Sequence, residues 1–100
     1  MNYSPYFNPE METLTRSEIQ ALQLERLQKT VAHCMNSPFY RKRFQKAGIR
    51  PEDIKTLDDI RRIPMTTKQD LRDTSPFGIA SIPPRDFVRL HSSSGTTGTP

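Results

Sequence analysis

Apolar residues recur at helical spacing in the first third of the chain. One stripe of them falls on a single side: Leu24, Leu27, Val31, Cys34 and Met35. Thr15 and Glu18 precede this stripe with the spacing of a capping box, in which each side chain satisfies the backbone N–H of the other residue. The pattern predicts a helix over residues 16–36 with one buried face.

A second helix is predicted over residues 38–47, because the residues at its two ends have recognisable roles. Ser37 can cap the first turn, and Pro38 suits the first helical position. Gly48 stands where a left-handed residue commonly ends a helix. Its apolar side consists of Phe39, Tyr40, Phe44 and Ala47. Aromatic residues at helical spacing are usually core residues, so this side is expected to be buried.

Two shorter helices are predicted in the second half of the chain. Thr56 can begin one over residues 57–62. Thr66 and Gln69 again have capping-box spacing and predict another over residues 67–73. The fold class expected from these segments is mainly α.

The chain ends are expected to be non-helical. Pro5 and Pro9 predict an extended arm over residues 1–14, since proline disrupts a regular helix. Residues 87–91 predict a short β-strand with alternating apolar positions. The domain organisation expected is this arm, a helical region over residues 15–91 and a loop over residues 92–100.

Composition suggests an incomplete domain. Only 33% of the 100 residues are hydrophobic and there is no tryptophan, so the core is expected to be thin. No signal peptide or membrane-spanning run is visible, and one cysteine forms no internal disulfide. Cytoplasm is therefore the expected location, with no membrane partner.

The net charge of +4 comes from the first half of the chain. A basic run lies there: Arg41, Lys42, Arg43, Lys46 and Arg50. It could contact nucleic acid or another polyanion, but it lacks a recognition module and a base-stacking aromatic pattern. A solvated helix face is the favoured interpretation, and no nucleic-acid partner is expected.

Side chains that could be reactive are interpreted as structural. Cys34 falls on the apolar stripe, and His33 points about 100° away from it on the helix, as the helical period requires. Asp70 and Asp73 are interpreted as solvated carboxylates rather than an acid/base pair. No metal site and no catalytic residue are predicted within this chain.

The last nine residues, Ser92–Pro100, are rich in hydroxyls and glycine and contain no aromatic residue and no Ala, Val, Leu, Ile or Met. By composition alone such a segment is a flexible linker. Its glycines and successive backbone amides could also form an anion-binding nest for a phosphate, which composition alone favours less than a linker. It lacks the spacing and the lysine of a Walker A loop.

The order of the residues favours the phosphate. Residues 89–100 resemble the phosphate-binding motif of adenylate-forming enzymes, in the form found in phenylacetate–CoA ligases. Three upstream segments match that family in order and spacing: Ser37–Tyr40, Ile63–Arg72 without Gln69, and Pro76–Gly78. The chain therefore resembles the N-terminal portion of such a ligase, part of an α/β fold.

The resemblance implies a two-step reaction. An aryl acid and ATP give an acyl-adenylate, and coenzyme A then displaces AMP to give the thioester; Mg²⁺ neutralises phosphate charge. The residues implied in ATP-phosphate binding are Ser93, Ser94, Gly95, Thr96, Thr97, Gly98 and Thr99. Thr99 stands where many relatives have lysine, so the electrostatic contribution there is expected to be weaker.

Other expectations concern the fragment as a whole. The adenine, acid and CoA contacts of the family lie downstream, so this chain alone is expected to be inactive. A poorly ordered tail after Leu90 and association into a dimer are also expected. Two alternatives stay open: a related aryl- or acyl-CoA ligase for another acid, and a basic helical binding module with a disordered tail.

Overall fold

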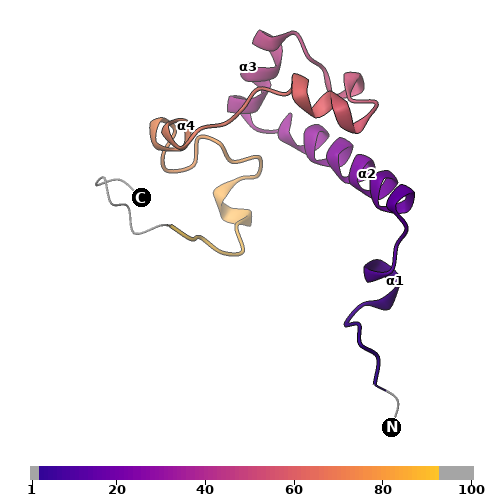
Figure 1. The fold of residues 1–100 in the computed structure, drawn as a ribbon. Helices are drawn as coiled ribbons and strands as arrows, with labels where there is room; N and C mark the ends of the chain where they lie inside the picture. Colours follow the sequence, from indigo (N-terminus) through magenta and orange to yellow (C-terminus); the bar gives the residue numbers. More distant parts are fainter. Residues whose placement is uncertain (1–2, 93–100) are drawn as a thin grey trace.

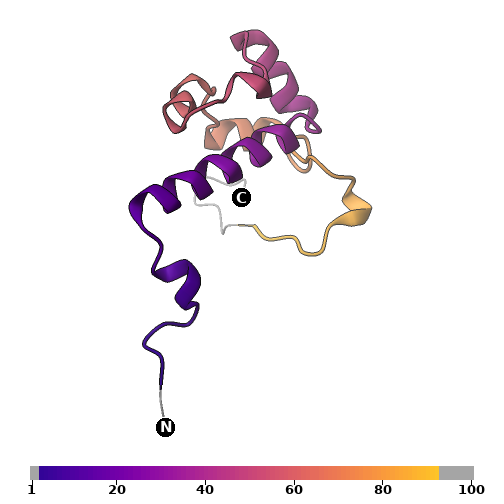
Figure 2. The same cartoon turned by 90° about the vertical axis from the view of Figure 1, so that its right-hand side faces the viewer.

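The computed structural model describes residues 3–92, and their regular secondary structure is helical. The elements are α1 (Pro9–Glu12), α2 (Arg16–Cys34), α3 (Pro38–Ala47), the 3₁₀-helices η1 (Pro51–Asp53) and η2 (Leu57–Arg62), α4 (Lys68–Asp73) and the 3₁₀-helix η3 (Pro84–Asp86). Figures 1 and 2 show α2 as the long central element, with α3 and η2 on one side and residues 79–92 on the other. The predicted mainly α fold is confirmed.

Helix α2 begins as predicted, at a complete capping box. The Thr15 hydroxyl accepts from the Glu18 backbone N–H, and the Glu18 carboxylate accepts from the Thr15 backbone N–H, both at 3.3 Å. The helix ends at Cys34, two residues earlier than predicted. Met35 and Asn36 instead donate to carbonyls three residues back, which tightens the chain into a turn.

Both predicted ends of α3 are confirmed. The Ser37 hydroxyl, fully buried, accepts from the Tyr40 backbone N–H at 3.4 Å, and Pro38 occupies the first turn. Gly48 ends the helix with φ of 70°, a left-handed conformation that glycine adopts without a Cβ clash. The short turn before Ser37 therefore passes directly into α3.

The core is as thin as the composition predicts. Its buried residues are Val31, Phe44, Ile49 and Ile54, with Leu27, Met35 and Ile63 packed against them. Gln28 also joins α2 to this cluster, because its side-chain amide donates to the Ile54 carbonyl at 2.9 Å. Helix α2 thus packs against the η1 and η2 segments, and α3 contributes Phe44 to the same cluster.

Helix α4 forms where predicted, but its capping box is shifted by one residue. The Thr67 hydroxyl accepts from the Asp70 backbone N–H at 3.1 Å, and the Asp70 carboxylate accepts from the Thr67 backbone N–H at 2.9 Å. The predicted box of Thr66 and Gln69 is wrong. Thr66 instead donates to the Tyr40 hydroxyl at 3.0 Å, which joins this segment to α3.

The N-terminal arm is not extended throughout. Residues 9–12 form the single turn α1, because Asn8 accepts from the Met11 backbone N–H at 3.3 Å and Pro9 takes the first helical position. Proline is tolerated there, since its missing N–H would have no helical partner. The prediction of a wholly extended arm is therefore wrong over these four residues.

The predicted strand at residues 87–91 is not observed, since no strand occurs within residues 3–92. Phe87 lies edge-on against Phe77, with ring centroids 5.3 Å apart, while Val88 is 99% exposed. Alternating apolar residues favour a strand only when another strand supplies hydrogen bonds. The described part of the chain offers none.

Candidate functional site

The seven residues predicted to bind ATP phosphates lie outside the described part of the chain. They are Ser93, Ser94, Gly95, Thr96, Thr97, Gly98 and Thr99. The structure does describe the segment that leads to them, as far as Ser92. The contacts that hold this segment are therefore the part of the candidate site that the geometry reveals.

Residues 74–92 form the approach to the predicted loop. Its first turn is tight, because the Gly78 backbone N–H donates to the Thr74 carbonyl at 2.7 Å. A Cβ at Gly78 would lie 2.5 Å from that oxygen, so the turn requires glycine. Further along, the Ser81 hydroxyl lies 2.8 Å from Nε2 of His33 on α2. The approach is thus joined to the helical body.

Asp70 connects α4 to α3. Its carboxylate is 2.6 Å from the Arg43 guanidinium, and the Asp70 side chain is only 15% exposed. The Thr67 backbone N–H, and then Arg43, hold the pKa of Asp70 below its usual range. Asp73 instead accepts from Gln69 at 2.7 Å. Asp70 and Asp73 therefore have separate partners and form no acid/base pair. Asp70 forms an ion pair with Arg43 and is not simply solvated.

Three of the five residues in the basic run make contacts within the fold. Arg41 donates to the Met35 carbonyl at 3.0 and 2.9 Å, which satisfies the end of α2. Arg43 pairs with Asp70 and lies over the Phe39 ring, 4.7 Å from its centroid. Arg50 pairs with Asp53 at 3.4 Å. These contacts give three of the five basic residues a structural role.

Cys34 is half-buried, and burial raises the pKa of its thiol. The thiol is therefore protonated near neutral pH and poorly nucleophilic. Within residues 3–92 no group of three or more His, Cys, Asp or Glu side chains could hold a metal ion. The structural interpretation of Cys34 fits this environment.

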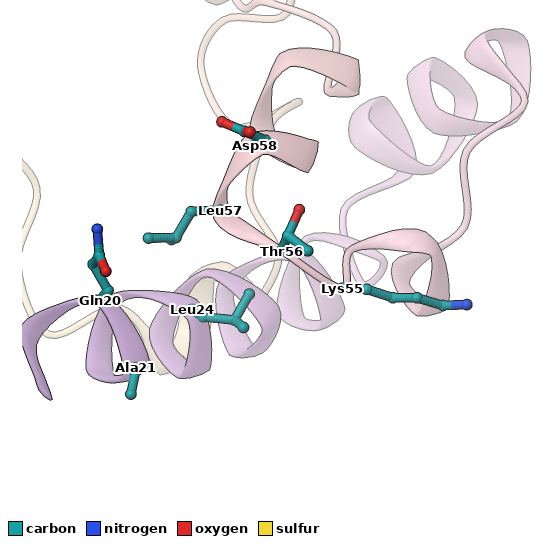
Figure 3. Close-up of a pocket in the computed structure, with 7 residues that line it drawn as sticks. All are labelled: Gln20, Ala21, Leu24, Lys55, Thr56, Leu57 and Asp58. Atoms are coloured by element: carbon teal, nitrogen blue, oxygen red, sulfur yellow. The ribbon is translucent and has the colours of Figure 1, made fainter. Parts of the chain in front are cut away.

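A pocket of about 410 Å³ lies between α2 and the start of η2 (Figure 3). Gln20 and Leu24 point into it from α2, with Leu57 facing them. Lys55 and Asp58 line its rim, but their charged ends point away from each other in Figure 3. Among the described residues that line the pocket, the charged ends of Lys55 and Asp58 do not converge, so they form no acid/base pair there (Figure 3).

Comparison with known proteins identifies the relatives of this chain. No protein-family model matches it. Over 91 residues it is 50% identical to the phenylacetate-coenzyme A ligase of Escherichia coli strain K12, and over 95 residues 47% identical to that of Thermus thermophilus. The chain is a relative of the phenylacetate-coenzyme A ligases. The resemblance predicted from the sequence is confirmed.

The match extends along most of this chain but only part of each ligase. It covers 90% and 94% of this chain, and 21% of each of the two ligases. The chain thus spans about a fifth of the length of the curated relatives it matches. The helices described above are therefore the counterpart of one region of a much longer enzyme.

Two solved structures share the fold. One is a crystal structure of 2-hydroxyisobutyryl-CoA ligase in complex with 2-HIB-AMP and CoA, with a TM-score of 0.84 and 34% sequence identity. The match covers 99% of this chain and 23% of the ligase chain. An open conformation of that ligase matches 94% of this chain and 25% of its own, with a TM-score of 0.78 and 32% identity. The helical arrangement is thus that of a segment of an acyl-CoA ligase.

None of the helices within residues 3–92 combines the length and the apolar character needed to cross a bilayer.

Proposed function

We propose that this chain is part of an ATP-dependent ligase that joins an aryl acid, phenylacetate, to coenzyme A. The observation that carries the proposal is the 45–50% identity to four phenylacetate-coenzyme A ligases over most of the chain. The neighbouring crystal structure supports the same reaction type, because it contains both 2-HIB-AMP and CoA.

The proposed reaction has two steps. A carboxylate oxygen of the acid attacks the α-phosphorus of ATP and releases pyrophosphate, which forms the acyl-adenylate. The CoA thiolate then attacks the acyl carbon and releases AMP. Hydrogen-bond donors directed at the departing pyrophosphate accelerate the first step, because contacts that strengthen in the transition state lower its barrier.

The loop of Ser93–Thr99 is proposed to supply those donors. Its hydroxyls and backbone amides suit phosphate oxygens, and Gly95 and Gly98 allow close backbone approach. Mg²⁺ would accompany ATP and neutralise part of its charge. Because the loop offers hydrogen-bond donors and no carboxylate, it suits the phosphate groups of ATP better than Mg²⁺.

Phenylacetate is favoured over another acid, although the crystallographic neighbour is named for 2-hydroxyisobutyrate. The phenylacetate-coenzyme A ligases are 45–50% identical to this chain, whereas that neighbour is 32–34% identical. The alternative of a basic binding module is less favoured, because Arg41, Arg43 and Arg50 are engaged within the fold. We also propose a cytoplasmic enzyme with no nucleic-acid partner, able to form a homodimer.

The test is a panel of acids with the purified full-length protein, ATP, Mg²⁺ and CoA. Phenylacetate is expected to give AMP and phenylacetyl-CoA in equal amounts, with benzoate and 2-hydroxyisobutyrate much slower. Absence of acid-dependent AMP formation with every acid would reject the ligase proposal. Binding to nucleic acid that weakens steeply with salt would favour the binding module instead.

A further inference from the structure

Helix α4 is not expected to be stable by itself, because it is short and buries little. It has six residues, whereas isolated helices below about 12 residues are only marginally stable in water. Within α4 no residue is buried, and Leu71, its one apolar residue, is 54% exposed. Hydrophobic burial therefore contributes little to α4, and polar contacts with a neighbouring element have to hold it.

Helix α3 supplies such contacts through Arg43. The Arg43 guanidinium lies 2.6 Å from the Asp70 carboxylate, and it donates to the Met65 carbonyl at 3.4 Å. It also lies over the Phe39 ring, 4.7 Å from the ring centroid. Arg43 is well placed to hold these groups, because the next residue, Phe44, is 3% exposed and belongs to the core. Arg43 therefore joins the core helix α3 to α4 and to the residues before it.

Asp70 connects Arg43 to both ends of α4. At the start of the helix, the Asp70 carboxylate also accepts from the Thr67 N–H. At the end, the Asp70 carbonyl accepts from the Thr74 hydroxyl at 2.7 Å and from the Thr74 N–H at 3.2 Å. The Thr74 carbonyl in turn accepts from the Gly78 N–H at 2.7 Å. A continuous series of contacts thus runs from α3 through α4 to Gly78.

We propose that residues 65–78 are a conformational device, a single cooperative unit that folds only while Arg43 holds it on α3. Opening of this unit breaks polar contacts and exposes little further apolar surface, so it requires less free energy than unfolding of the core. The unit opens as a whole, because the same Asp70 carboxylate that pairs with Arg43 also caps α4. This inference goes beyond the proposed ligase activity and does not depend on it.

Residue-resolved hydrogen exchange of the full-length wild-type protein is the first test. The amides of Leu71, Thr74 and Gly78 donate within the unit, so they are expected to share a similar protection. The Ile49 amide donates to the Phe44 carbonyl in the core and is expected to be protected more strongly. Protection of the three amides equal to that of Ile49 would overturn the proposal.

Arg43→Gln tests whether α3 holds the unit. The three amides of the unit are expected to exchange about five- to thirtyfold faster, with exchange at Ile49 unchanged. Lys42→Gln removes the same charge from an exposed position of α3 and is the matched control, expected to change neither. Unchanged exchange in Arg43→Gln rejects the role of Arg43. Equal acceleration at Ile49 indicates a general loss of structure and rejects a unit that opens separately from the core.

Thr74→Val tests whether the unit opens as a whole, since it removes the hydroxyl that donates to the Asp70 carbonyl. For a single unit, exchange at Leu71 and at Gly78 is expected to accelerate by the same factor. Thr74→Ser keeps the hydroxyl and is expected to retain wild-type exchange at both amides. Acceleration at Gly78 alone shows that the turn frays independently of α4, which contradicts the single unit.

Discussion

Ile54 shows how much a single side chain contributes when the core is small. It is only 1% exposed, and its carbonyl accepts from Gln28 of α2. With four buried hydrophobic residues in the described core, few neighbours are available to fill a vacancy. The cost of removing a core side chain is therefore expected to be large relative to the total stability.

Ile54→Ala is expected to lower the free energy of unfolding by about 2–5 kcal/mol, through lost burial and the cavity left behind. Ile60→Ala is the matched control, because Ile60 lies in the neighbouring η2 but is 56% exposed. Urea unfolding followed by circular dichroism measures both. An equal loss in the two variants would contradict the assignment of Ile54 to the core.

At the scale of the elements, carboxylates stabilise several helix starts. Glu18, Asp53, Asp59 and Asp70 each accept from the backbone N–H three residues earlier. The pKa of each carboxyl is held below its ordinary value, at Asp53 and Asp70 mainly by these backbone hydrogen bonds. The main cause at Glu18 is the Thr15 hydroxyl, followed by the Thr15 N–H. The main cause at Asp59 is the Lys55 N–H, followed by the Thr56 N–H. The start of α4 also depends on tertiary contact, because Arg43 pairs with the same Asp70 carboxylate.

Asp70→Asn is expected to destabilise the protein at pH 7, since it removes the ion pair with Arg43 and weakens the cap of α4. The pKa of Asp70 is lowered on folding from 3.8, so its stabilisation is present above that pH and is lost as the pH falls through the folded-state pKa. The difference in unfolding free energy between wild type and variant is therefore expected to shrink on acidification below about pH 4.

Asp73→Asn is the control for this pH dependence. Asp73 lies on the same helix, where its carboxylate accepts from the Gln69 side-chain amide, and within residues 3–92 it forms no ion pair to α3. Urea titrations at a series of pH values compare the two variants with the wild type. If the Asp70→Asn difference stays constant from neutral to acid pH, the ion pair and cap do not contribute as proposed.

At the scale of the whole molecule, many apolar side chains stay exposed in the described part. Met65 is 84%, Leu90 69% and Leu71 54% exposed. Because the chain corresponds to about a fifth of its relatives' length, the remaining part of a ligase offers surface that could cover these residues. The described helices are therefore expected to fold against further structure in the complete enzyme.

The 100-residue chain alone is expected to form no AMP and no thioester, while retaining a helical circular dichroism spectrum from the capped helices α2 and α3. We propose that the contacts to the acid, the adenine and CoA lie outside it, as the resemblance implies. Assays with phenylacetate, ATP, Mg²⁺ and CoA measure this directly. Acid-dependent AMP formation by the chain alone would contradict the division of the active site proposed above.

Sequence reasoning succeeded where the deciding contacts are local. The starts of α2 and α3, and the end of α3, follow from residues within one turn: Thr15 with Glu18, Ser37, and Gly48. The ATP-loop residues Ser93–Thr99 were predicted from a motif and stay a prediction. His33 and Ser81 were missed as a pair, because no local pattern relates residues 48 positions apart.

Local residue order by itself therefore determined the helical fold class, the main helix ends and the likeness to phenylacetate-coenzyme A ligases. The tertiary structure decided between alternatives that local chemistry leaves nearly equal. Thr66 could have capped α4, but contact with Tyr40 engages Thr66, and Arg43 stabilises Asp70 in the box with Thr67. Residues 87–91 could have formed a strand, but strands require hydrogen-bonding partners, and the described chain supplies none.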